Sequence, residues 1–486
     1  MSITMSSIVA NLAGTFIGIV FGAIPGLTGV MAVALLLPFT FGMDTVTAFG
    51  LLLGIYCGAV YGGSITAILI KTPGTPAAAC TVLEGYPLAT QGKAKEALSL
   101  AAIASFVGGI ISCAILVFVA PKLATIAIKF GPEEYFAVGL FGLSIVGALS
   151  ANNLKKGVIS ALFGLMLANI GVDPVTGVSR MTFGITGLLN GIALVPALIG
   201  LFAISEVINK VSTIDRPHVD LNIGKIDGGF ISPSVLKANI VNLIRSSLIG
   251  TIIGIIPGTG SAVSPWIAYS ETRRVSKHKE LFGKGSYEGV AAAESANNGV
   301  TGGAMIPLLC LGIPGDAVTA VLLGALMIQG LTPGPMLFVT HATVIQEIYV
   351  MLLIANIFMV ILGLAGVNLF VKVLKVETRF LIPIVMSLCF IGGYAINNSV
   401  TDMMILLVLG VVAFFMIKGG FPIPPAILGV ILGNTIESNF RRALTISRGD
   451  FAIFLDPICL TFLIISVCAF FGPCLMKAIQ RGKKRC

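Results

Sequence analysis

The chain consists of long uncharged apolar stretches separated by short polar segments. No charged residue occurs from Met1 to Met43, and Leu98 to Ala120 forms a second uncharged run. A helix needs about 20 apolar residues to cross a bilayer, so each of these runs is long enough for a crossing. Counting such runs predicts roughly ten to twelve transmembrane helices. The pattern therefore predicts an all-α polytopic membrane protein.

Composition supports this prediction and excludes several classes of function. Of 486 residues, 56% are hydrophobic and 10% are charged, whereas about a quarter of a soluble domain is charged. The net charge of +9 lies in a few loops and in the tail RGKKRC, which favours positive-inside loops over nucleic-acid binding. The nine cysteines form no CxxC pair and the three histidines are isolated. We therefore expect no cofactor, no His-based catalytic triad and no enzyme, and there is no GxxxxGK[ST] loop for ATP.

Five short motifs recur in the same order in the two halves of the chain, at offsets of 232 to 245 residues. This order predicts two internal repeats, residues 1–209 and 238–449, joined by a polar linker at 210–237 and followed by a C-terminal helix and basic tail at 450–486. Two unrelated helical bundles would leave the order unexplained. The motif pairs are Pro25-Gly26 and Pro257-Gly258, Gly62-Gly63 and Gly302-Gly303, Pro73-Gly74 and Pro314-Gly315, Gln91-Gly92 and Gln329-Gly330, and Asn152-Asn153 and Asn397-Asn398.

Charge in equivalent loops indicates how the repeats are oriented. The loop ETRRVSKHKE is basic whereas its first-half counterpart PFTFGMDTVT is not, and EGYPLATQGKAKE is basic whereas GALMIQGLTPGPM is not. Because basic loops stay on the cytoplasmic side, this exchange predicts inverted repeats. One pair disagrees, since the stretches around Lys122 and Lys372 are both basic.

The Pro-Gly pairs interrupt apolar stretches. Only 25 uncharged residues separate Arg245 from Glu271, with Pro257-Gly258 near their centre, which is too few for two full spans. Proline removes a backbone donor and glycine permits a chain reversal, so the segment is either one broken span or a hairpin that re-enters. Irregular backbone at membrane depth is tolerated only where protein buries it or where it lines a wet cavity.

A helix that restarts after such a break presents unpaired N–H groups and a positive dipole end, which attract anions. We expect the four breaks to converge near the midplane and to bind an anionic substrate, as in broken-helix transporters. For any single break, a structural kink is an equally good interpretation. The candidate substrate-binding residues are Pro25, Gly26, Thr28, Ser64, Lys71, Pro73, Gly74, Thr75, Pro257, Gly258, Thr259, Ser261, Asn297, Asn298, Pro314 and Gly315.

Polar residues inside apolar stretches suggest a cation site. The segment ESANNGVTGG carries Glu294 and several amides and hydroxyls within two helical turns, and such oxygens suit Na⁺. The candidate ligands are Asn297, Thr301 and Asp316, with interhelical hydrogen bonding as the alternative for the first two and helix capping for Asp316. Lys71 follows an apolar run of some 26 residues, and it could pair with a substrate carboxylate or extend to an interface.

Glycines recur at every fourth position in the helices that precede the breaks. This spacing predicts closely packed helix backbones rather than ligand contacts. The positions are Gly14, Gly18, Gly22 and Gly26, then Gly50, Gly54, Gly58 and Gly62, and in the second half Gly250, Gly254 and Gly258.

At these motifs the chain resembles the large membrane subunit of the tripartite tricarboxylate transporter family, the TctA family. The resemblance is carried by GAIPGLTG, YGGSITAILIKTPGTPAA, LEGYPLATQGKAKEALSLAA and the long stretch from KELFGKGSYEGVAAAESANNGVTGG to ALMIQGLTPGP. It implies a secondary transporter of the bacterial inner membrane that imports citrate or a related carboxylate with Na⁺ or H⁺. It also implies a small TctB-like membrane subunit and a periplasmic TctC-like solute-binding protein as partners. The sequence departs from the family at Lys71, where relatives commonly have Asn, and this cation would change which anion fits.

Other functions remain open from the sequence. A passive anion channel would lack cation coupling, and a membrane scaffold would bind no carboxylate. An intramembrane enzyme would need a nucleophile with a base or paired acids, and the acidic residues here are dispersed. The sequence does not distinguish an elevator motion from a rocking motion. It also leaves open whether the chain forms a homo-oligomer.

Overall fold

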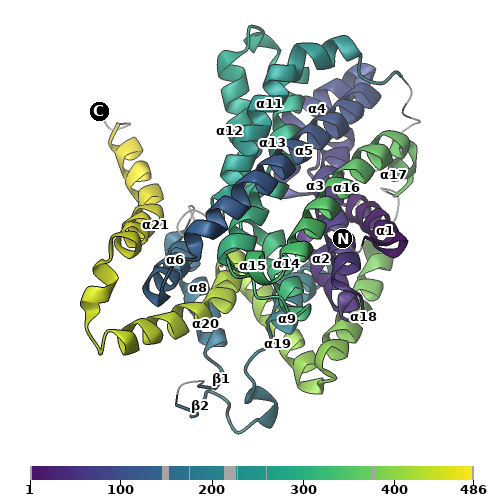
Figure 1. The fold of residues 1–486 in the computed structure, drawn as a ribbon. Coiled ribbons are helices and arrows are strands. Elements are labelled where there is room, and N and C mark those ends of the chain that lie inside the picture. The colour runs from purple at the N-terminus through teal and green to yellow at the C-terminus, as the bar shows by residue number, and fades with distance from the viewer. Residues whose placement is uncertain are drawn as a thin grey trace. The chain divides into compact units, whose positions relative to one another are not determined.

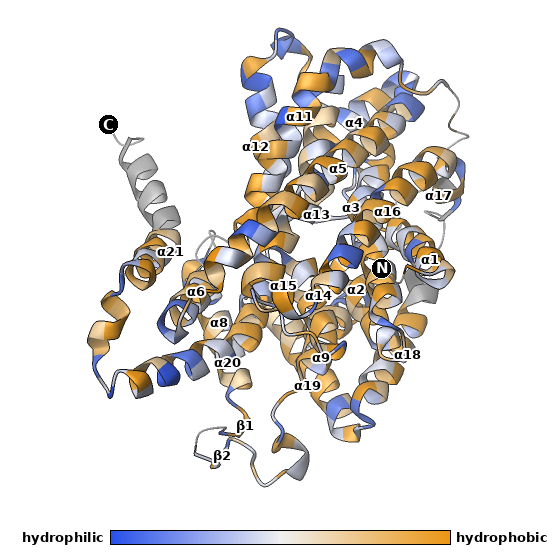
Figure 2. Ribbon diagram, viewed as in Figure 1, coloured by the Kyte–Doolittle hydropathy of each residue, from blue (hydrophilic) through white to orange (hydrophobic). Residues whose placement is uncertain are grey.

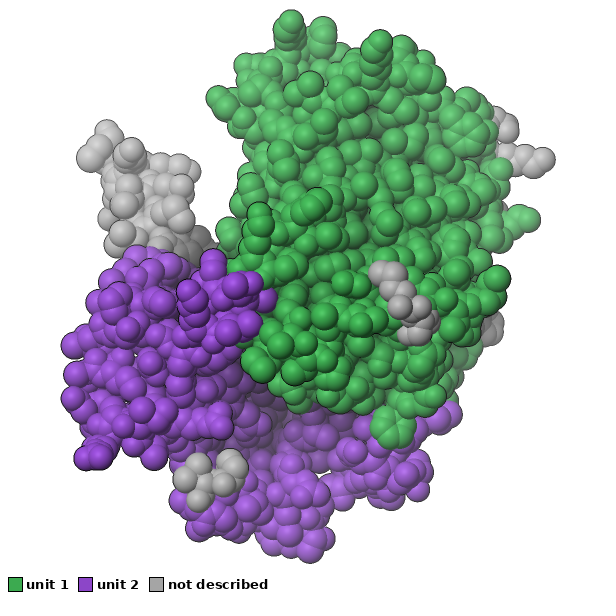
Figure 3. Space-filling view, in the orientation of Figure 1, with its two compact units in different colours: residues 1–123, 210–388 green, residues 124–209, 389–486 purple. Residues whose placement is uncertain are grey.

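The computed structural model describes residues 3–144, 153–173, 176–212, 226, 228–258, 260–373 and 378–483. It divides into two compact units, coloured separately in Figure 3. Unit 1 comprises residues 1–123 and 210–388, and unit 2 comprises residues 124–209 and 389–486. Each unit therefore combines a part of the first predicted repeat with a part of the second. Asn152 and half of the linker, residues 213–225 and 227, lie outside the described residues.

Unit 1 holds the helices before and after the predicted breaks (Figure 1). Two of its helices, α5 and α18, continue into unit 2. Its helices are α1 (Met5–Ala23), α2 (Gly29–Leu36), α3 (Thr45–Ile70), α4 (Val82–Leu88), α5 (Ala94–Ala127), α11 (Pro233–Ile255), α12 (Gly260–Val275), α13 (Tyr287–Leu311), α14 (Ala317–Ile328), α15 (Leu337–Thr340), α16 (Ala342–Ala365), α17 (Val367–Val373) and α18 (Thr378–Asn397), with a short 3₁₀ turn, η2 (Pro76–Ala79), before α4.

Unit 2 is also helical and contains one small hairpin. Strands β1 (Gly171–Val172) and β2 (Ser179–Arg180) pair antiparallel, with Gly171 opposite Arg180. Helix α10 crosses the boundary between the units. The helices are α6 (Pro132–Ser144), α8 (Leu154–Ala168), α9 (Leu194–Leu198), α10 (Ser205–Val211), α19 (Val400–Lys418), α20 (Ile423–Ile446) and α21 (Pro457–Lys483).

Seven of the described helical segments are long and apolar enough to cross a membrane, and four shorter helices are apolar. Helices such as α16 are coloured almost entirely as hydrophobic in Figure 2, whereas polar residues gather at turns and helix ends. A helix satisfies all its backbone groups internally, which a lipid environment requires. The protein is therefore an all-α polytopic membrane protein, as predicted; the number of ten to twelve crossings remains a prediction.

The four Pro-Gly pairs that recur between the two halves all interrupt helices. Segment 24–28 separates α1 from α2, segment 71–75 separates α3 from η2, segment 256–259 separates α11 from α12, and segment 312–316 separates α13 from α14. Glycine is required at two of these reversals, since Gly26 and Gly258 have φ of 86° and 76°. Thr259 lies outside the described residues.

The glycine stripes pack helix against helix. A Cβ on Gly14, Gly18 or Gly22 of α1 would lie within 2.1–2.3 Å of a carbonyl oxygen of α3, at Leu51, Ile55 or Ala59 in turn. Because the partner number rises with the glycine number, α1 and α3 are parallel. In the second half, Gly250 and Gly254 of α11 meet Ala296 and Val300 of α13 in the same way. The same parallel pair therefore occurs in each half.

Because α11 and α13 are parallel, the chain between them must run back in the opposite direction. Helix α12 is this returning segment. Arg245 of α11 donates to the Thr272 hydroxyl of α12 at 3.1 Å, and Thr272 donates to Asn242 at 2.7 Å. Residues near the end of α12 thus lie beside the middle of α11. This contact favours a helical hairpin that re-enters over one broken span.

Among the contacts between the two halves is that of α3 with α13, which run antiparallel. Ser64 contacts Glu294, Val60 contacts Asn297, and Tyr56 contacts Asp316 just beyond the end of α13. Equivalent helices in opposite directions are the arrangement that an inverted repeat produces. The two basic loops also lie at one end of unit 1, where Gln91 Nε2 donates to the Lys284 carbonyl at 2.8 Å.

One predicted boundary differs from the structure. Helix α11 begins at Pro233, inside the predicted linker 210–237. The Ser232 side chain accepts from the Ser234 N–H, and proline occupies the first turn, where its missing N–H costs nothing. The sequence ISPS carried this start signal.

Candidate functional site

The first two breaks lie against each other in unit 1. A Cβ on Gly74 would be 2.0 Å from the Gly22 carbonyl oxygen, so the second break rests directly on the end of α1. The Gly74 N–H also donates to the Gly63 carbonyl of α3 at 3.2 Å. Thr75, the next residue, has its hydroxyl beside Gly63. That hydroxyl is buried and has no hydrogen-bond partner.

The third and fourth breaks are joined in the same way. The Gly258 N–H donates to the Gly315 carbonyl at 2.7 Å. A Cβ on Gly315 would lie 2.7 Å from the Gly254 carbonyl, which repeats the relation between Gly74 and Gly22. Gly260, the first residue of α12, lies against Asp316. The structure thus brings together the candidate Pro-Gly residues in two equivalent pairs.

The amide ends of the restarting helices differ in how they are capped. The Thr28 hydroxyl accepts from the Met31 N–H at 3.2 Å at the start of α2. Asp316 caps α14, where its Oδ1 accepts from Thr319 and its Oδ2 accepts from the Tyr56 hydroxyl at 2.6 Å. Asp316 therefore places a carboxylate of the chain itself at the amide end of α14. Of the other candidates there, Ser261 is half-buried in the first turn of α12.

The candidate amides and hydroxyls of α13 are buried, and some lack partners. Asn297 donates to the Val60 carbonyl at 3.4 Å, while its side-chain oxygen has no partner. Both polar atoms of the Asn298 side chain are buried without a partner. Thr301 donates to the Asn298 carbonyl at 2.7 Å. Because a buried amide without a hydrogen bond is costly, these atoms favour a ligand or water beside them.

Lys71 lies apart from this cluster. It ends α3 with a left-handed backbone (φ 57°), and its exposed ammonium lies 5.6 Å from the centre of the Tyr86 ring. This position favours the interface anchor over the substrate ligand. The end of α3 at Ile70 agrees with the apolar run of about 26 residues in the sequence.

The structure places a lysine beside the first break that the sequence analysis did not predict there. The Lys210 ammonium lies 3.4 Å from the Pro25 carbonyl, and a Cβ on Gly26 would lie 1.5 Å from it. The two residues are 185 positions apart in the chain. Nothing in the local sequence links them, so only the folded chain reveals this contact.

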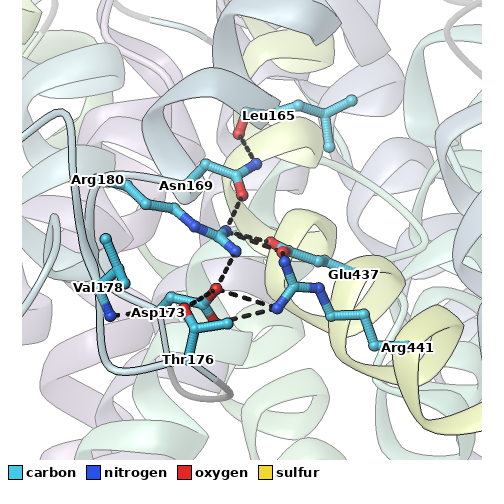
Figure 4. A network of polar contacts seen from close by, with 8 residues as sticks. All are labelled: Leu165, Asn169, Asp173, Thr176, Val178, Arg180, Glu437 and Arg441. Carbon is cyan, nitrogen blue, oxygen red and sulfur yellow. Dashed lines mark hydrogen bonds and ion pairs between the residues drawn. The ribbon is translucent and has the colours of Figure 1, made fainter. Parts of the chain in front are cut away.

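A second polar cluster occurs in unit 2 (Figure 4). Arg180 of β2 forms ion pairs with Asp173 at 2.5 Å and Glu437 at 2.8 Å, and Arg441 of α20 pairs with the same two acids at 3.0 Å each. The hydrogen bond to Glu437 and that to Asp173 raise the pKa of Arg180 above its ordinary value. The cluster lines a cavity of about 450 Å³. The two arginines and the two acidic residues neutralise one another. We therefore interpret this cluster as a structural contact that attaches the β1–β2 hairpin to α20.

Metal binding through the usual side chains has no support in the described part of the chain. No three His, Cys, Asp or Glu residues there lie close enough together to hold a metal ion. The Na⁺ prediction relies on amide, hydroxyl and single carboxylate oxygens, so it remains a prediction.

Comparison with known proteins identifies the family. Residues 8–428 match the "Tripartite tricarboxylate transporter TctA family". A relative from Agrobacterium vitis, described as "Uncharacterized 52.8 kDa protein in TAR-I ttuC' 3'region", is 37% identical over 96% of this chain and 93% of its own length. Another from the same organism, "Uncharacterized protein in TAR-II ttuC' 3'region", is 38% identical over 44% of this chain and 89% of its own length. No solved structure shows a significant match. The chain belongs to the tripartite tricarboxylate transporter TctA family.

Proposed function

We propose that this tripartite tricarboxylate transporter subunit imports citrate or another di- or tricarboxylate by secondary active transport. The observation that carries the proposal is the convergence of the four helix breaks in two equivalent pairs inside unit 1. Breaks of this kind hold substrates in transporters with inverted repeats because the amide ends bind anionic groups.

The substrate carboxylates bind at the amide end of α2, beside the first break, because Gly260 at the start of α12 lies against Asp316. Asp316 already occupies the end of α14 and would repel a second anion there. Lys210 beside Gly26 supplies a positive charge at the first break. Thr28, Thr75 and Ser261 supply hydroxyls.

A cation gradient drives the uptake. The partnerless amide oxygens of Asn297 and Asn298, with Thr301 and Asp316, suit Na⁺, whereas a buried carboxyl suits H⁺. The chain works in the bacterial inner membrane with a small TctB-like subunit. A periplasmic TctC-like binding protein delivers the substrate.

Uptake into proteoliposomes tests this proposal. The chain is reconstituted with its small subunit, the binding protein is added, and labelled carboxylates are offered with a Na⁺ gradient, a proton gradient or neither. We expect at least one carboxylate to accumulate above its external concentration when one of the gradients is present. Equilibration without accumulation would identify a passive channel, and no carboxylate flux under any gradient would contradict transport altogether.

A further inference from the structure

Glu294 of α13 is fully buried and is surrounded by hydroxyl groups. Its Oε1 accepts from the Ser64 hydroxyl at 2.6 Å and from the Thr81 hydroxyl, and its Oε2 accepts from the Ser105 hydroxyl at 3.1 Å. These donors come from α3, from the residue before α4 and from α5, respectively. Three separate elements therefore converge on one carboxyl group.

Glu84, which is equally buried, shows a different arrangement. It accepts from three backbone N–H groups, those of Gly283, Gly285 and Ser286 at 2.5–2.9 Å, and from the Tyr269 hydroxyl at 2.6 Å. Backbone N–H groups can only donate a hydrogen bond and cannot accept one. A Ser or Thr hydroxyl can donate or accept. The groups around Glu294 can therefore serve the ionised and the protonated carboxyl alike.

The charge balance also favours a proton at Glu294. Among the described residues, no Lys, Arg or His forms an ion pair with it. The titratable groups close to its charge are Tyr61 of α3 and Cys80 in the segment before α4, with Glu84 and Tyr269 beyond Cys80, and the group facing it from α5 is the neutral Ser105. None of these is a cation. A buried carboxylate without a counter-charge costs several kcal/mol, which binding a proton removes.

The position of the cluster connects it to the substrate site. Ser64 follows Gly63, whose carbonyl accepts from Gly74 of the second break, and Thr81 follows η2, which begins just after that break. Two of the three hydroxyls thus lie on either side of segment 71–75. A proton at Glu294 makes one of the three hydroxyls turn from donor to acceptor, so protonation rearranges a cluster of contacts that includes one residue on each side of this break.

We propose that Glu294 carries the coupling proton of transport, with Ser64, Thr81 and Ser105 as the groups that stabilise its two protonation states. The carboxylate takes up one H⁺ to become a carboxylic acid and releases it on the opposite side of the membrane. A Na⁺ ion would have to displace hydroxyls that already contact the carboxylate directly. This inference rests on the proposed carboxylate transport.

The test compares Glu294→Gln with wild type in the reconstituted complex, with two assays. The first measures carboxylate accumulation driven by a proton gradient, together with substrate-dependent acidification of the vesicle interior. The second measures exchange of labelled for unlabelled substrate without a gradient. We expect Glu294→Gln, a neutral mimic of the protonated acid, to lose proton-driven accumulation and acidification while exchange persists. Proton-driven accumulation that survives in Glu294→Gln would overturn the inference.

A milder variant covers the case in which Glu294→Gln fails to fold. Ser105→Ala removes one donor, and we expect it to shift the pH dependence of uptake to higher pH because the carboxylate loses a stabilising hydrogen bond. Ser112→Ala on the same helix is the matched control, since Ser112 bonds Gly109 and Gly302 and does not contact Glu294. An identical pH profile for the two serine variants would contradict the inference.

If wild type neither accumulates nor exchanges any carboxylate, the proposed function itself fails. If wild type accumulates substrate with Na⁺ alone and without acidification, only the role of Glu294 fails.

Discussion

Replacing Gly74 by alanine tests whether the second break must rest against the end of α1. The new Cβ would lie 2.0 Å from the Gly22 carbonyl oxygen, 2.8 Å from Thr66 Oγ1 and 2.9 Å from Gly63 Cα. Ordinary contact begins at 3.4 Å, so the Gly22 backbone would have to move by 1.4 Å, the difference between 3.4 and 2.0 Å. Two of the three obstructing atoms are backbone and cannot rotate away.

Overpacking of a well-packed interior costs about 1–3 kcal/mol, and a backbone clash from two sides belongs at or above the upper end, roughly 3 kcal/mol. We expect Gly74→Ala to lower the thermal unfolding midpoint of the purified protein and to abolish uptake. Gly42→Ala is the matched control, because its Cβ would meet nothing within 4 Å, and such surface changes fall within about 0.5 kcal/mol. Equal midpoints and equal uptake for the two variants would refute the close contact between the second break and α1.

Three further predictions concern the other breaks and unit 2. Gly258→Leu should abolish uptake while membrane insertion remains normal, because leucine resists φ of 76° but keeps the segment apolar; normal uptake would make the third break purely architectural. Lys210→Gln should weaken carboxylate binding by about tenfold, the loss of one partly buried charge contact of about 1–2 kcal/mol, as measured by substrate-dependent thermal stabilisation; Lys71→Gln serves as the control, and equal affinity for the two variants would place Lys210 outside the substrate site. Arg441→Ala should destabilise the protein by roughly 1–2 kcal/mol without changing substrate affinity, since buried Asp173 keeps Arg180 as its partner; a change in affinity would instead make the cavity of unit 2 a ligand site.

The direction of the chain after each break depended on the tertiary structure. The sequence around Pro257 and Gly258 allowed either a broken span or a hairpin, because both need the same proline and glycine. The contact between Arg245 and Thr272 favours the hairpin, and it joins residues 27 positions apart. The sequence predicts two repeats, whereas the two compact units each take residues from both predicted repeats.

The sequence by itself determined the membrane class, the four helix interruptions and the glycine stripes, because each depends on residues within a few positions of one another. Apolar length, the missing N–H of proline and the absent Cβ of glycine act locally. The antiparallel contact of α3 with α13 was decided only by the tertiary structure, as were Lys210 at Gly26 and the hydroxyl groups around Glu294. Ser64 and Glu294 are 230 residues apart, and no local pattern specifies such a contact, since it arises from how complete helices pack.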